Sequence, residues 1–110
     1  MGSKPMSVRP PATCENMEQV RAEIDRLDLA ILDLVAERFG YVERAWQLKT
    51  RPEEATVPWR IQQVIDRVRA RAEEKGVPPE LAEALWRQMI GWFIQYEEEK
   101  LSNGPPEQGG

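Results

Sequence analysis

Two cations, Arg38 and Lys49, interrupt an apolar stripe and are the side chains that most directly indicate chemistry. They lie eleven residues apart, which in an α-helix is three turns and about 20° around the axis. Val42 and Ala45 lie between them, so small apolar residues separate two cations in one row. A charge on a buried face is costly without a counter-ion, although a long cationic side chain can also reach solvent. The row therefore indicates either a salt bridge within the chain or a site for a small anion.

The composition limits the chemistry that such a site could perform. Among 110 residues there is no histidine and a single cysteine, Cys14. This excludes a disulfide framework within the chain, a zinc site of the usual ligands and a histidine-based catalytic triad. The formal net charge of -4 argues against a nucleic acid or an anionic membrane as partner, because both require a basic surface. An enzyme of this composition would work without an imidazole base or a conventional nucleophile.

The two ends of the chain differ from its middle. Residues 1–13 and 102–110 are rich in proline and glycine and poor in apolar residues, so we expect two flexible segments around one helical domain, residues 14–101. The first residues lack the apolar core of a signal peptide, and no apolar run has the roughly 20 residues that cross a membrane. We therefore expect a cytoplasmic protein.

The run from Asn16 to Thr50 predicts one long amphipathic helix. Gln19 follows Asn16 at the spacing of a capping box, and Pro52 disfavours continuation past Thr50. Apolar residues recur at steps of three and four: Met17, Val20, Ile24, Leu27, Ile31, Leu34, Val42, Ala45 and Leu48. Such a helix would be roughly 50 Å long, more than the width of a compact domain of this size. It needs a partner outside its own chain.

Two further helices complete an all-α chain. The second begins at Pro58 or Trp59 and ends at Gly76, and the third begins at the Pro78–Pro79 pair and ends before Ser102. Two apolar rows follow the third helix: Leu81, Leu85, Met89, Trp92 and Tyr96, and Trp86, Ile90 and Phe93. Because these rows cover a wide arc, we expect the third helix to lie centrally.

Glu97 and Arg21 are the remaining charged residues of interest. Glu97 continues the second apolar row at its next four-residue step, but it also opens the charged run 97–100, which is typical of a solvated face. Arg21 lies 17 residues before Arg38, so on one straight helix the two are about 26 Å and 100° apart. They cannot share a small ligand within one chain. In an antiparallel dimer, however, Arg21 of one chain can approach Arg38 and Lys49 of the other.

The segment VRAEIDRLDLAILDLVAERFGYVERAWQLK resembles the all-helical (AroQ-type) chorismate mutases and the related isochorismate pyruvate lyases. The resemblance extends over residues 14–101, which is nearly everything outside the two tails. It implies a three-helix chain that forms an intertwined homodimer with two equivalent sites. It also implies a small dianionic substrate, chorismate or isochorismate, and a reaction that needs neither metal nor cofactor.

The resemblance assigns roles to five charged residues. Arg21 resembles the arginine that the second subunit lends to one substrate carboxylate, while Arg38 and Arg60 resemble those that bind carboxylates from the same chain. Lys49 resembles the lysine that contacts a carboxylate and the ether oxygen. Glu97 occupies the place of a glutamine or glutamate that donates a hydrogen bond to the same oxygen, which a glutamate can do only when protonated.

Two features leave the exact activity open. Val42 matches the apolar floor of the pocket, but Ile61 stands where many mutases carry a glutamate for the substrate hydroxyl, and the lyases are aliphatic there. The loop between Lys49 and Arg60 also has a lyase-like length. We expect a chorismate mutase, which forms prephenate, with an isochorismate pyruvate lyase as the alternative. A helical dimer without catalysis, or a regulatory mutase-like protein, is the further alternative.

Overall fold

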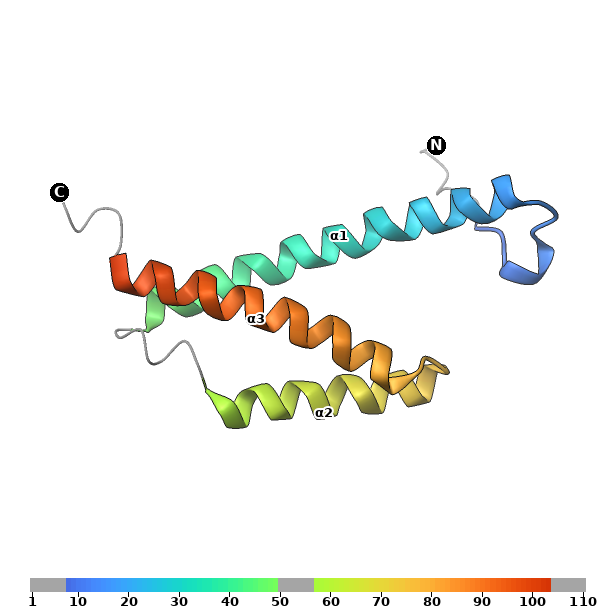
Figure 1. Ribbon diagram of the computed structural model, residues 1–110. Coiled ribbons are helices and arrows are strands. Elements are labelled where there is room, and N and C mark those ends of the chain that lie inside the picture. Colours follow the sequence, from blue (N-terminus) through green and yellow to red (C-terminus); the bar gives the residue numbers. More distant parts are fainter. Residues whose placement is uncertain (1–7, 50–56, 104–110) are drawn as a thin grey trace. The chain divides into compact units, whose positions relative to one another are not determined.

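The computed structural model describes residues 8–49 and 57–103, and most of these residues are helical (Figure 1). After a short 3-10 turn, Pro11–Thr13, the elements are α1 (Met17–Leu48), α2 (Pro58–Lys75) and α3 (Pro79–Asn103). The described residues contain no strand, which confirms the all-α, three-helix prediction. The predicted flexible ends fall largely on residues 1–7 and 104–110, outside the described part. None of the helices in the described ranges is long and apolar enough to cross a membrane.

Helix α1 begins with the predicted cap. The Gln19 N–H donates to Asn16 Oδ1 at 2.9 Å, and Gln19 Oε1 accepts the Glu15 N–H at 2.7 Å. The return bond thus reaches one residue before the cap, and it still satisfies a backbone donor outside the helix. At the other end, the Lys49 N–H donates to the Trp46 carbonyl at 3.3 Å, so the last turn of α1 is tightened just before the chain leaves the helix.

Gly76 ends α2 as predicted. Its φ of 77° is left-handed, a conformation that glycine adopts without steric cost. The Val77 N–H donates to the Ala72 carbonyl at 2.8 Å and the Gly76 N–H to the Glu73 carbonyl at 3.3 Å. This is a Schellman motif, and it reverses the chain so that α3 returns along α2.

The chain divides into two compact units, Met1–Gly40 and Tyr41–Gly110, and α1 crosses the boundary between them. In the first unit the described residues form the 3-10 turn and the larger part of α1, and none of their side chains is buried. Exposed apolar residues follow this part of the helix, among them Ile24 (50% exposed), Ile31 (56%) and Leu34 (65%). The apolar stripe predicted from the sequence is therefore exposed along the described part of this unit.

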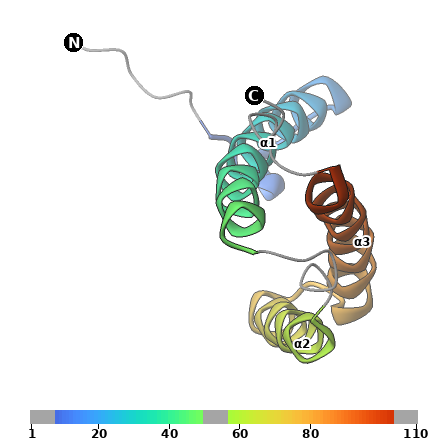
Figure 2. The ribbon, with the colours of Figure 1, turned by 90° about the vertical axis from the view of Figure 1, so that its left-hand side faces the viewer.

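The second unit contains the core. Helices α2 and α3 lie side by side in both views (Figures 1 and 2) and pack on each other. The buried apolar residues of the described chain all belong to this unit: Trp46, Ile65, Ala72, Ala82 and Phe93. In the single chain Leu81, Leu85 and Trp92, on the other side of α3, are about half exposed, and the central position expected for this helix stays a prediction.

Candidate functional site

Lys49, directly after α1, and Glu97, near the end of α3, meet in the second unit. Lys49 Nζ donates to Glu97 Oε1 at 2.7 Å, and Glu97 is only 7% exposed. The interpretation that Glu97 belongs to a solvated run is therefore wrong. The physical reason is its place on the helix: Phe93, one turn earlier, is also buried, and Glu97 continues that buried row with a cation as its partner.

This contact gives Lys49 a counter-ion within the chain, which is one of the two alternatives that the sequence had left open. An ammonium carries three donors and a carboxylate several acceptor positions, so one hydrogen bond does not exhaust either group. The Lys49 side chain keeps 27% of its surface accessible, whereas that of Glu97 keeps 9%. The pair is thus held from the Glu97 side and open to solvent from the Lys49 side, which suits the approach of a small anion.

A second polar cluster lies beside this pair and was missed in the sequence. Glu43 Oε1 accepts the Trp46 indole N–H at 3.0 Å, and Glu43 Oε2 accepts the hydroxyl proton of Tyr96, the residue before Glu97. The Tyr96 hydrogen bond lowers the pKa of Glu43, and the same bond together with burial raises the pKa of Tyr96 to about 12. The contact between Glu43 and Trp46 could have been predicted, because the two residues are three positions apart on a helix and therefore lie on the same face.

Aromatic contacts fix the position of the Tyr96 ring. Trp92 stacks on it with centroids 5.4 Å apart and planes inclined by 15°, and Trp92 also meets Phe93 edge to face at 5.1 Å. Lys100 Nζ lies 5.4 Å from the centre of the Tyr96 ring, within the range of a cation–π contact. The same lysine contributes to the lowered pKa of Glu43. The hydroxyl of Tyr96 is therefore presented to Glu43 by a ring held in place by neighbours on α3.

The other predicted residues are found in separate surroundings. Arg60 is exposed at the start of α2 and donates from Nη1 to Gln63 Oε1 at 2.6 Å within its own helix. Ile61 and Val42 are half-buried in the second unit. The remaining two arginines lie on α1 in the first unit, Arg21 exposed and Arg38 half-buried. Of the predicted set, the structure brings Lys49 and Glu97 together, and the loop 50–56 lies outside the described residues.

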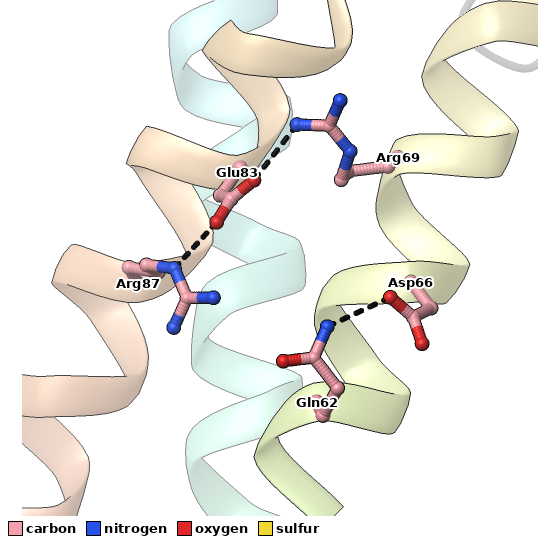
Figure 3. Close-up of polar contacts among 5 residues, drawn as sticks. All are labelled: Gln62, Asp66, Arg69, Glu83 and Arg87. Carbon is pink, nitrogen blue, oxygen red and sulfur yellow. Dashed lines mark hydrogen bonds and ion pairs between the residues drawn. The ribbon is translucent and has the colours of Figure 1, made fainter.

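A further ion network joins α2 to α3 away from this pair (Figure 3). Glu83 of α3 pairs with Arg69 of α2 at 2.7 Å and with Arg87 of α3 at 2.6 Å. Both arginines hold the pKa of Glu83 below its ordinary value, and the hydrogen bond from Arg87 has the larger effect. Nearby on α2, Gln62 donates to Asp66 at 2.8 Å. The three ion-paired side chains keep between 29% and 49% of their surface accessible. Ion pairs open to solvent add little to stability, so the network orients the two helices more than it holds them together.

Comparisons with known proteins agree with this all-helical arrangement. The family model of chorismate mutase type II matches residues 20–98, a range that includes Arg21, Arg38, Lys49, Arg60 and Glu97. An isochorismate pyruvate lyase of Pseudomonas aeruginosa is 30% identical to the chain over 87 residues, which are 79% of this chain and 86% of that protein.

Proposed function

The chain belongs to the chorismate mutase type II family, and on that premise we propose that it is itself a chorismate mutase, which converts chorismate to prephenate. The observation that carries the proposal is the buried contact between Lys49 and Glu97. A cation and a potential hydrogen-bond donor side by side are what the ether oxygen of chorismate would need as its bond breaks.

The reaction suits the side chains that the protein has. In the Claisen rearrangement the ether C–O bond breaks while a new C–C bond forms in one concerted step. No nucleophile, metal or cofactor takes part, so catalysis consists of holding the folded conformer and stabilising the negative charge that grows on the ether oxygen. In the proposal, Lys49 donates to this oxygen from one side and Glu97, in its protonated form, from the other.

The two carboxylates of the substrate would be bound by arginines. Arg38 and Arg60 serve one chain's own pocket, and Arg21 is contributed by a second copy in a homodimer. The exposed apolar stripe on α1 supports the dimer, because a row of side chains such as Ile24, Ile31 and Leu34 is rarely left in water on a monomeric protein. A second copy of α1 would cover it.

An isochorismate pyruvate lyase is the second candidate, and two observations favour it. The relative from Pseudomonas aeruginosa carries that name, and Ile61 is an aliphatic residue in the first turn of α2, next to Arg60. The lyase reaction eliminates pyruvate from isochorismate and leaves salicylate, so it also breaks an ether C–O bond in a concerted step. The same Lys49–Glu97 pair would serve either reaction, and the substrate decides between them.

The test is to incubate the purified protein separately with chorismate and with isochorismate. Prephenate formation is followed by the loss of chorismate, and salicylate formation by its fluorescence. Prephenate from chorismate supports the proposal, and salicylate alone replaces it with the lyase. If neither product forms, both enzymatic candidates are contradicted, and a helical dimer without catalysis remains. Lys49→Met should abolish most turnover, and Lys75→Met, an exposed lysine at the end of α2, is the matched control that should not.

A further inference from the structure

We propose that the hydrogen bond between Glu43 and Tyr96 is a positioning contact that holds Lys49 within reach of Glu97. Neither residue touches the substrate in the function proposed above. Their role would be to fix the end of α1 against α3, so that the two groups that face the ether oxygen stay at hydrogen-bonding distance. The kinetic part of this inference rests on the proposed function, whereas the geometric part does not.

On the α1 side, Glu43 is connected to Lys49 through Trp46. The Trp46 indole donates to Glu43 Oε1 at 3.0 Å, and the Trp46 carbonyl accepts the backbone N–H of Lys49 at 3.3 Å. Trp46 is 5% exposed, so its ring is fixed by packing in the core. The residue that orients Glu43 therefore also orients the backbone from which the Lys49 side chain starts.

On the α3 side, Tyr96 immediately precedes Glu97. Its ring is stacked on Trp92, which is itself packed against Phe93 of the same helix. The hydroxyl of Tyr96 crosses to Glu43 Oε2 on α1. This contact joins the two elements one residue away from the carboxylate that pairs with Lys49.

The chemistry of the contact makes it a firm one. The acceptor is a carboxylate, both of whose oxygens are engaged, and hydrogen bonds to a charged acceptor are roughly twice as strong as neutral ones. Lys100, whose ammonium lies over the Tyr96 ring, adds a positive charge near Glu43. A lysine side chain is flexible, so its ammonium is well placed only if its backbone is fixed relative to the partner helix.

The kinetic test compares variants of the contact in the enzyme assay. Tyr96→Phe removes one hydroxyl and should lower kcat about tenfold, because small misplacements of reacting groups are costly, while KM stays within about twofold. Glu43→Ala should lower kcat by a similar factor, and Glu43→Gln should lower it less because it keeps an acceptor oxygen. The double variant Glu43→Ala with Tyr96→Phe should lower kcat no more than Glu43→Ala alone.

Tyr41→Phe is the matched control for the kinetic test, because it removes the hydroxyl of the other tyrosine, which is 73% exposed. It should leave kcat unchanged. An active protein whose kcat does not change in Tyr96→Phe, or in which KM alone rises, would overturn the inference. If Tyr96→Phe fails to fold, as judged by circular dichroism, Glu43→Gln takes its place because it preserves the shape of the side chain.

A second test does not require activity. The unfolding equilibrium is measured for the wild type, Tyr96→Phe, Lys49→Met and the double variant at one protein concentration, because a dimer's stability depends on concentration. If the contact holds the Lys49–Glu97 pair in place, Lys49→Met should raise the unfolding equilibrium constant about fivefold less in the Tyr96→Phe background than in the wild type.

An equal effect of Lys49→Met in both backgrounds would overturn the inference even if kcat falls in Tyr96→Phe, since the loss would then be independent of the pair. Should the wild type convert neither chorismate nor isochorismate, the proposed function fails by itself. The stability measurement would in that case still decide whether the contact positions Lys49 and Glu97.

Discussion

Replacing Lys49 by methionine separates a structural salt bridge from a catalytic pair. The substitution keeps an unbranched side chain and removes the ammonium, so the Glu97 carboxylate, 7% exposed, loses its cation. Breaking a fully buried pair in this way costs about 3 to 5 kcal/mol. Because the Lys49 side chain keeps 27% of its surface accessible, we expect a loss of about 1 to 3 kcal/mol in the free energy of unfolding.

The effect on catalysis should be larger than the effect on stability. If the Lys49 ammonium stabilises the charge that grows on the ether oxygen, its removal should cost about 2.7 to 4 kcal/mol of transition-state stabilisation, or about 10² to 10³ in kcat. A second variant, Lys49→Met with Glu97→Leu, tests whether the two effects share a cause. Replacing a buried ion pair by apolar residues is often neutral or stabilising, so this variant should regain stability but not activity.

The assay measures chorismate loss under saturating substrate and thermal unfolding of the same samples, with Lys75→Met as the control. A Lys49→Met variant that keeps kcat within about threefold of the wild type while losing stability would refute the catalytic role, since the expected loss is about 10² or more. Recovery of activity in the apolar double variant would refute it equally, because neither methionine nor leucine can donate to an ether oxygen.

Three further predictions concern Tyr96, Glu97 and Arg21. The ring of Tyr96, followed by NMR, should titrate with a pKa of about 12, and Glu43→Gln should move that pKa toward 10. Because folding raises the pKa of Tyr96, the stability that its hydroxyl contributes is present below pH 10 and is lost as the pH rises through 12. If Glu97 donates a hydrogen bond to the ether oxygen, Glu97→Ala should lower kcat by about 10² or more and Glu97→Gln, whose amide also donates, by less, whereas an unchanged kcat in Glu97→Ala would remove Glu97 as the donor. Mixing Arg21→Ala with Lys49→Ala should restore roughly a quarter of wild-type activity after random exchange, because each mixed dimer has one intact site; no recovery would count against sites shared between chains.

The local features of the fold could be predicted because short-range chemistry determines them. The cap formed by Asn16 and Gln19 and the left-handed turn at Gly76 both follow from residues within a few positions of each other. The burial of Glu97 could not be predicted from its neighbours in the sequence, because a glutamate that opens a charged run is typical of a solvated face until its partner is known. That partner, Lys49, is 48 residues away, and the contact between Glu43 and Tyr96 spans 53.

The exposed part of α1 connects the assembly of the protein to its chemistry. The part of α1 that lies in the first unit buries none of its side chains, and such a stretch is marginal in water, since most helical stability in proteins comes from packing an apolar face. The first unit therefore requires a cover for residues such as Ile24 and Ile31, and Arg21 lies on the same stretch of helix, one turn before Ile24. If a second copy supplies that cover, the event that buries the stripe also delivers Arg21 to the partner's site. Completion of the pocket would then depend on the pairing that covers the stripe, and the mixed-dimer experiment tests whether such pairing brings Arg21 to the partner's site.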